Sequence, residues 1–257
     1  EMVTGRLVTE EFSLVTTMKE KRSDMLTFSA SYFTEVFSKL LVAVPFTFEV
    51  ILISAMLCMV SGALVSIIRI TKCPVLYEIS EVWLSLVRSI PFVLMLFLSY
   101  FLLPFLLKSA GIPTGGIPKV VYVYITMVFA YAPVIAEVIR PAYFSIEKGQ
   151  REAAIVFGMT PWQCILQVVM PQMIPAVLPP LVNQLIEIVK DTSLMYMIGL
   201  MDLMGRTELL ITVNQGIGKL ESYLAVAILY WGVVAALEAV MKYLENRQTR
   251  ILSRRVS

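Results

Sequence analysis

Long runs of apolar residues dominate the chain. Four uncharged runs cover 50–68, 89–107, 120–136 and 222–237, and each is close to the ~20 residues with which a helix crosses about 30 Å of hydrocarbon. A fifth run, 153–186, is too long for one crossing and contains a glycine and five prolines, so only 171–190 is expected to cross. The runs are continuous rather than alternating, as barrel strands would be. The pattern predicts five membrane-spanning helices.

Composition supports this interpretation. The 257 residues are 58% hydrophobic and 16% charged, with a mean hydropathy of +0.80, which is too apolar for a water-soluble core. We therefore expect an all-α membrane protein.

The residue types exclude several chemistries. The chain has no histidine, which removes Ser-His-Asp triads and histidine-ligated zinc or haem. Cys58, Cys73 and Cys164 lie far apart and indicate small buried residues rather than a disulfide framework or a metal knuckle. We predict no catalytic site, no metal site and no cofactor in this chain. A net charge of +2, with basic residues at the ends of apolar runs, does not indicate nucleic-acid binding.

The chain divides into three parts. Residues 1–28 contain no apolar core of signal-peptide length, and helical apolar spacing then predicts a short amphipathic helix on the membrane surface. Residues 1–40 are thus a tail and surface helix, 41–245 a transmembrane domain, and 246–257 a basic tail. The residues that give the helical spacing are Tyr32, Phe33, Val36, Phe37, Leu40 and Leu41.

Basic residues at the ends of the runs predict the orientation. With the carboxyl terminus inside, ten Lys and Arg residues lie on the inner side and five on the outer side, although residues 1–40 add five to the outer side. The excess favours an inner carboxyl terminus. We expect a multi-pass protein of the plasma or inner membrane, with its amino terminus outside and its carboxyl terminus in the cytoplasm. The inner ten are Arg69, Lys72, Arg140, Lys148, Arg151, Lys242, Arg247, Arg250, Arg254 and Arg255.

The segment 145–170, between the third and fourth runs, is apolar but too punctuated to cross. Good helix-forming sequence reaches from Gln150 to Phe157, and Gly158 suits the left-handed position that ends a helix. Thr160 and Gln163 form a capping-box pattern around Pro161, which fits a first helical position. The pattern predicts two short helices that form a bent cytoplasmic protrusion, kept slim by Ala153 and Ala154.

This segment resembles the EAA loop of ABC importer permeases. The match consists of Glu152-Ala153-Ala154, Gly158 and then Val168, Met170 and Pro171, where Val168 and Met170 replace the usual Ile and Leu. The stretch 88–91, Arg-Ser-Ile-Pro, resembles the family's R-G-T-P. The stretches 179–184 and 190–194, followed by Ile198-Gly199, resemble the polar amino-acid uptake permeases in particular.

The resemblance implies a type I importer, in which two permease subunits, as a homo- or heterodimer, join two ATP-binding subunits and an extracytoplasmic solute-binding protein. This chain would be a permease that forms the translocation path for polar amino acids. ATP and Mg²⁺ would then belong to the partner ATPase. The sequence agrees, because it lacks a G-x-x-x-x-G-K-[S/T] phosphate loop; the nearest string, 216–219, has the wrong spacing.

The resemblance also assigns the coupling contact. Glu152 is the main candidate for contact with the ATPase, although its alternative role is to favour a helix amino terminus through the dipole. The full set of candidates is Glu152, Ala153, Ala154, Gly158, Met159 and Pro161.

Charged residues at membrane depth are costly and indicate function. Glu187 follows Asn183 and Gln184 to form a polar stripe, which predicts a face toward a cavity or a partner helix. The alternative is a structural network, either Glu187 with Lys190 or Asp191 at a helix end. The candidates for the substrate path are Asn183, Gln184, Glu187, Lys190, Asp191, Thr192 and Ser193.

Two further pairs are candidates for a gate or for structure. Glu137 and Arg140 are spaced for a local ion pair, with an inner gate as the alternative. Arg88 and Ser89 stand before Pro91 at the start of the second run, where an arginine can extend to the interface. Small residues on the first run, including Gly62 and Ser66, predict close packing against either a partner permease or the fourth span.

Two other functions stay open. One is an ion-coupled secondary carrier that works alone, and the other is the structural half of a heterodimeric permease whose companion holds the substrate. An intramembrane enzyme would need paired carboxylates such as Glu137 and Glu187, which the topology places near opposite faces.

Overall fold

The computed structural model describes residues 28–256, and only the backbone of 244, 245 and 248–256. All regular structure in this part of the chain is helical, and five helical segments are long and apolar enough to cross a membrane: Val44–Thr71, Phe92–Ser109, Lys119–Phe144, Pro161–Ile198 and Lys219–Tyr243. The predicted fold class and the five spans are confirmed. The elements are α2 (Ala30–Leu41), α3 (Val44–Thr71), α4 (Pro74–Ser89), α5 (Phe92–Phe97), η1 (Leu98–Leu102), α6 (Leu103–Ser109), α7 (Lys119–Phe144), α8 (Lys148–Val156), α9 (Pro161–Cys164), η2 (Ile165–Val169), α10 (Met170–Thr192), η3 (Ser193–Ile198), α11 (Leu203–Val213) and α12 (Lys219–Val256).

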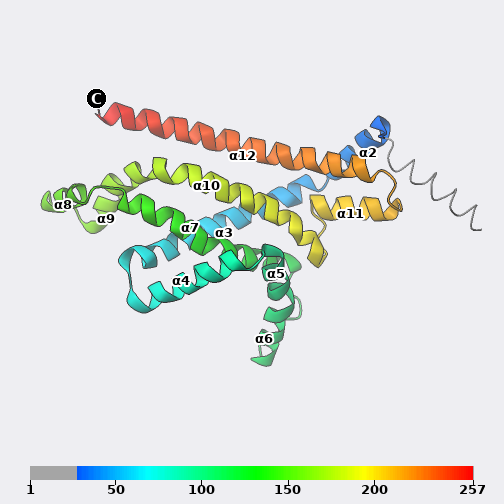
Figure 1. Ribbon diagram of the computed structural model, residues 1–257, viewed down its shortest axis with the longest axis horizontal. Coiled ribbons are helices and arrows are strands. Elements are labelled where there is room, and N and C mark those ends of the chain that lie inside the picture. The colour runs from blue at the N-terminus through cyan, green and yellow to red at the C-terminus, as the bar shows by residue number, and fades with distance from the viewer. Residues whose placement is uncertain (1–27, 257) are drawn as a thin grey trace, which may run out of the picture.

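Four long helices, α3, α7, α10 and α12, run along the longest axis of the molecule (Figure 1). Helices α8 and α9 lie at one end of this bundle, which we call the coupling end. Helices α2 and α11 lie at the opposite end, which we call the far end (Figure 1). The segment from α5 to α6 leaves the bundle at an angle to the long axis.

The core is centred on the contact between α3 and α7. Gly62 of α3 lies against Ile135 of α7 so closely that a Cβ on this glycine would stand 2.5 Å from the Ile135 Cγ2 atom. Ser54 and Ser66 are buried on the same helix. Small residues let two backbones approach closely within a membrane. Gly62 therefore packs against the third span, which neither of the two expected partners of this face included.

Helix α4 was not predicted. It begins at Pro74, a favourable first helical residue, and returns beside α7, where the Trp83 indole Nε1 donates a 3.0 Å hydrogen bond to the Phe129 carbonyl oxygen. Phe129 lies near the middle of the 26-residue helix α7. The expected second span began at residue 89, but α4 already lies alongside the middle of a span before α5 begins at Phe92.

The helix breaks at the end of α4 because Ile90 and Pro91 adopt extended backbone conformations. Proline provides no backbone N–H, and it disfavours the helical conformation of the residue before it. The chain resumes as α5 and continues through the π-helical turn η1, where the Ser99 hydroxyl donates to the Tyr122 carbonyl oxygen at 3.2 Å.

The prediction for the fourth span was also wrong in part. We expected a short helix to end before residue 171, but α9, η2 and α10 form one continuous helical segment from Pro161 to Ile198. Pro171 is tolerated because it lies in the first turn of α10, directly after the π-helical turn η2. Three interior prolines remain within α10, where neighbouring helices stabilise an interrupted hydrogen-bond ladder.

The two terminal segments also differ from expectation. Helix α2 exists, but its apolar residues Val36 and Leu40 pack against Ala225 and Val226 of α12 rather than against lipid. The predicted basic tail continues α12 as helix to Val256. Residues 1–27 of the predicted tail, and residue 257, lie outside the described part of the chain.

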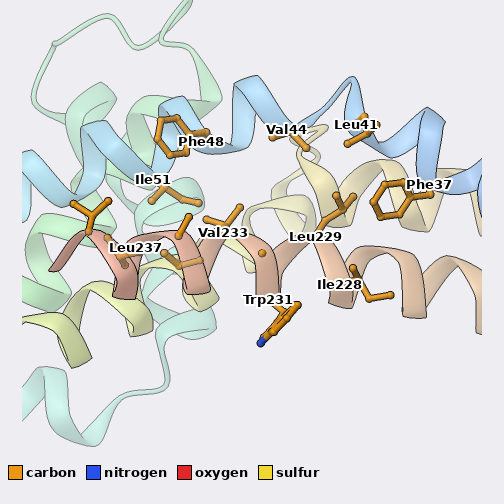
Figure 2. A pocket seen from close by; sticks show the side chains of 14 residues that line it. Phe37, Leu41, Val44, Phe48, Ile51, Ile228, Leu229, Trp231, Val233 and Leu237 are labelled. Atoms are coloured by element: carbon orange, nitrogen blue, oxygen red, sulfur yellow. The ribbon is translucent and has the colours of Figure 1, made fainter. Parts of the chain in front are cut away.

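An apolar groove of about 670 Å³ lies where α2 and α3 meet α12. In Figure 2, Phe37 of α2 and Phe48 of α3 lie across from Leu229 and Val233 of α12. Apolar side chains and one glycine form its whole lining, so the groove offers little to orient a polar solute.

Candidate functional site

The predicted bent protrusion is present at the coupling end. Helix α8 ends at Val156, and Gly158 two residues later has a φ of +81°, the left-handed conformation that favours glycine. Helix α9 then begins with a complete capping box: the Gln163 backbone N–H donates to Thr160 Oγ1 at 3.3 Å, and the Thr160 N–H donates to Gln163 Oε1 at 2.9 Å. We call α8, Gly158 and α9 together the coupling pair.

The coupling pair is fastened to two spans. Ala154 is buried in a small cluster that includes Cys164 and Ile146. The Arg151 guanidinium lies 4.8 Å from the ring centre of Tyr143 on α7. From the other side, Gln172 of α10 donates from Nε2 to Gln150 Oε1 at 2.7 Å. Side-chain contacts therefore tie the pair to both α7 and α10.

The structure divides the predicted coupling residues into two groups. Ala154 and Met159 pack inside the pair. Glu152 faces outward and forms a 3.1 Å ion pair with Lys148, with 61% of its side chain exposed. The other outward-facing members are Ala153, Gly158 and Pro161.

Three apolar side chains at the tip of the pair were missed by the sequence analysis. Val156, Phe157 and Trp162 are 84%, 86% and 67% exposed. Large apolar groups gathered in this way mark contact surfaces. Their sequence signal was the pair of apolar residues just before Gly158 and the tryptophan after Pro161, because a turn directs such residues away from the helix faces that pack.

The predicted path residues form a graded stripe along α10. Asn183, Glu187 and Lys190 are exposed. Lys190 Nζ and Glu187 Oε1 form an ion pair at 2.7 Å. Asp191 is half-buried and accepts a 2.7 Å hydrogen bond from the Tyr131 hydroxyl of α7. Gln184 is half-buried as well.

The side chains of the last two path candidates bond to backbone carbonyls of the preceding helical turn. Thr192 is fully buried, and its hydroxyl donates to the Val189 carbonyl oxygen at 2.7 Å. The Ser193 hydroxyl donates to the Lys190 carbonyl oxygen at 2.5 Å.

An ion network joins α3, α4 and α7. Arg69 is 1% exposed and contacts Ser80 at 3.1 Å, Glu81 at 2.8 Å and Glu137 at 2.5 Å. The predicted pair of Glu137 and Arg140 is longer, at 3.8 Å, so Arg69 is the principal partner of Glu137. The sequence did contain a signal for Arg69, since it follows Gly62 and Ser66 at helical spacing on the small-residue face.

Arg88 and Ser89 end α4 and are exposed. We expected Arg88 near the membrane interface, but the residues around it lie level with the middle of α7: Leu86 and Ile90 share a groove with Ile125 and Phe129. The turn that carries Arg88 therefore lies beside the first half of α7.

Asp202 at the far end is the only described acidic residue without exposed surface. It caps α11 by accepting a 2.8 Å hydrogen bond from the Gly205 N–H, and it accepts a 3.1 Å bond from the Tyr230 hydroxyl. Burial raises the pKa of the Asp202 carboxyl from 3.8 to about 6, although these hydrogen bonds oppose the rise. Within the described residues, no three His, Cys, Asp or Glu side chains form a group that could hold a metal ion.

Residues 59–250 match the family described as "Binding-protein-dependent transport system inner membrane component". The chain is 32% identical to the L-cystine transport system permease protein TcyL of Bacillus subtilis, with 81% of this chain and 88% of that protein covered. It is 30% identical to a Vibrio harveyi protein named "Probable amino-acid ABC transporter permease protein PatM", with 86% and 96% covered.

Two solved structures share the fold. The crystal structure of an amino acid ABC transporter with histidines superimposes with a TM-score of 0.71 at 20% identity, covering 86% of this chain and all of that one. An inward-facing structure of the MetNI methionine ABC transporter gives a TM-score of 0.64 at 22% identity, covering 81% and 95%. With its EAA-type coupling pair and five spans, the chain belongs to the family of binding-protein-dependent transport system inner membrane components, as an ABC importer permease.

Proposed function

We propose that this permease carries polar amino acids through the membrane and that ATP hydrolysis on separate ATPase subunits drives it through the coupling pair. The observation that carries the proposal is the exposed apolar tip, Val156, Phe157 and Trp162, on a protrusion held to two spans. The curated relatives, which are permeases for L-cystine and other amino acids by name, support the substrate class.

The tip is the part that inserts into the ATPase. Buried aromatic anchors contribute most of the binding energy of protein interfaces, and the surrounding polar groups contribute less. Phe157 and Trp162 are such anchors, whereas Glu152 and its exposed partner Lys148 form the polar rim. Exposed ion pairs of this kind contribute about 0–1 kcal/mol. Glu152 therefore orients the contact, and the aromatic residues supply its strength.

Movement of the tip changes access to the path. The cation–π contact of Arg151 with Tyr143 and the bond of Gln150 with Gln172 link the pair to α7 and α10. Closure of two ATPase subunits moves two such pairs relative to each other, and the attached spans follow as rigid bodies in alternating access.

The path runs along the exposed polar stripe of α10. Asn183, Glu187 and Lys190 are exposed on a helix long enough to cross the membrane. A charged group at the centre of a bilayer costs about 2.5–3.5 kcal/mol on insertion scales, so this face turns toward water or a partner permease. Glu187 and Asp191 present carboxylates to a substrate ammonium, and Lys190 balances part of their charge through its pair with Glu187.

The complete transporter contains two permeases, two ATPases that bind ATP and Mg²⁺, and an extracytoplasmic solute-binding protein. The coupling end faces the cytoplasm, which places the amino terminus outside and the carboxyl terminus inside. The excess of basic residues at this end supports the orientation.

The experiment is a paired substitution at the tip in the assembled transporter, reconstituted in liposomes. Val156→Ser with Phe157→Ser removes the apolar anchor, and Phe28→Ser, which changes another exposed phenylalanine near α2, is the control. Loss of two anchors is expected to weaken ATPase binding about 30-fold or more. The tip variant should lose the co-purifying ATPase and the ATP-dependent uptake of labelled L-cystine, L-glutamine and a panel of other amino acids.

The same liposomes separate this function from an ion-coupled carrier. Uptake by the wild-type assembly should require ATP inside the liposomes and continue after ionophores collapse the ion gradients. Uptake that persists without ATP, or a tip variant that binds and couples its ATPase as well as the Phe28→Ser control does, would contradict the proposal.

A further inference from the structure

Arg88 lies at a level where an exposed charge requires explanation. Trp83, five residues earlier on α4, bonds to Phe129 near the middle of α7. Leu86 and Ile90, on either side of Arg88, line one groove with Ile125, Thr126 and Phe129. Arg88 thus lies at the break between α4 and α5, beside a helix that is long and apolar enough to cross a membrane.

The charge of Arg88 is not neutralised within the described residues, where its side chain forms no hydrogen bond and no ion pair. The nearby ion network is balanced on its own, because Arg69 and Arg140 face Glu81 and Glu137. The turn around Arg88 therefore carries an excess positive charge. Such a charge does not face lipid.

A small hollow on the surface of α4 surrounds Arg88. Its volume is about 250 Å³, and it is lined by Glu81, Leu84, Ser85, Arg88 and Ser89. The Ser89 hydroxyl is occupied, since it donates to the Ser85 carbonyl oxygen at 2.9 Å. The Ser85 hydroxyl has no partner among residues 28–243 and is exposed. Ser85 and Arg88, three residues apart, therefore present free donors on the same helix face.

We propose that this hollow binds the carboxylate of the transported amino acid, with the Arg88 guanidinium and the Ser85 hydroxyl as its donors. The inference rests on the proposed function. A guanidinium binds a carboxylate with two parallel hydrogen bonds. The unpaired positive charge of Arg88 favours an anionic ligand over a neutral one. The helix break beside the hollow, at Ile90 and Pro91, leaves this turn at the end of a helix rather than within a packed one.

The test measures binding to the permease itself. Wild-type permease–ATPase complex in nanodiscs, without the solute-binding protein, is titrated with the labelled amino acid that the liposome panel shows to be transported. The competitor is the α-carboxamide of that amino acid. Arg88→Gln and Ser85→Ala are compared with Arg206→Gln, which removes an exposed arginine from α11, and Arg88→Lys tests whether charge alone suffices.

Loss of a hydrogen bond to a charged group weakens binding about 10- to 100-fold. Arg88→Gln should show that loss, Ser85→Ala and Arg88→Lys smaller ones, and Arg206→Gln none. The carboxamide should compete poorly. In complete transporters, Arg88→Gln should lower uptake at least tenfold while ATP hydrolysis stimulated by the binding protein stays within about twofold of wild type.

Three results would overturn the subsite and leave the transporter assignment intact: equal binding by Arg88→Gln and Arg206→Gln, equal competition by the carboxamide, or wild-type complex that binds nothing while its uptake is normal. Separation of the two permeases in Arg88→Gln, with normal binding in Ser85→Ala, would show a contact with the partner permease instead. Absence of ATP-dependent amino-acid uptake by wild type would contradict the proposed function itself.

Discussion

At the scale of single residues, Arg69 shows how a buried charge constrains a membrane protein. Its guanidinium is 1% exposed and binds two carboxylates, Glu81 on α4 and Glu137 on α7. A buried ion pair adds little stability compared with an apolar pair, but removing one partner is costly because the other charge stays buried. The fold therefore depends on Arg69 as long as Glu81 and Glu137 are both charged.

We expect Arg69→Gln to lower the free energy of unfolding by about 1–3 kcal/mol, because it leaves two partly exposed carboxylates near each other without their shared guanidinium. The measurement is thermal unfolding of the purified transporter in detergent. Adding Glu81→Gln should recover part of the loss, since Glu137 and Arg140 then balance each other and no net charge remains in the cluster. If Arg69→Gln unfolds at the same temperature as the exposed control Arg206→Gln, the network does not stabilise the fold.

At the scale of elements, the cap of α11 responds to pH. The Asp202 carboxyl is buried, and its pKa is raised from 3.8 to about 6. The folded chain therefore binds a proton more readily than the unfolded chain does between these two values. The free energy of unfolding must then fall as pH rises through this window.

We expect Asp202 to contribute up to about 3 kcal/mol more stability at pH 4 than at pH 7. Asp202→Asn keeps a good cap but cannot titrate, so the difference between the wild-type and variant unfolding curves isolates this residue. Asp202→Ala should cost about 0.5–2 kcal/mol through loss of the cap. Curves for wild type and Asp202→Asn that stay parallel from pH 4 to pH 7 would show that the carboxyl keeps its ordinary pKa.

Elements also show what the sequence could and could not predict. The coupling pair was predictable because each of its signals acts within a few residues, as with Gly158 at the helix end and Thr160 with Gln163 at the next start. The path of α4 was not, because it depends on a distant contact between Trp83 and Phe129. For the same reason the ion pair of Arg69 with Glu137 was not predicted, since the two residues are 68 positions apart.

The prediction for the fourth span was wrong for a different physical reason. Prolines break helices in water, where no neighbour compensates a missing hydrogen bond. Helix α10 packs against α7 and α12, and Pro171 directly follows a π-helical turn. Proline does have a low helix propensity, but packing within the membrane protein allows this segment to stay helical.

At the scale of the whole molecule, one chain leaves two polar faces exposed at membrane depth. One is the stripe of α10 with Asn183 and Glu187, and the other is the hollow at Arg88 on α4. Both helices pack against α7. Neither face is compatible with lipid, which supports the proposal that a second permease encloses the path.

The orientation of this unit can be tested with a cysteine that the chain already has. Cys73 follows α3 and is exposed, whereas Cys58 and Cys164 are buried. We expect a membrane-impermeant maleimide to label Cys73 in inverted vesicles and not in intact cells, because the proposed topology puts the α3–α4 turn in the cytoplasm. Gly115→Cys on a Cys73→Ser background, in the exposed loop before α7, should show the reverse. Labelling of Cys73 from outside would invert the topology, place the coupling pair beyond the reach of any cytoplasmic ATPase, and so remove the basis for coupling.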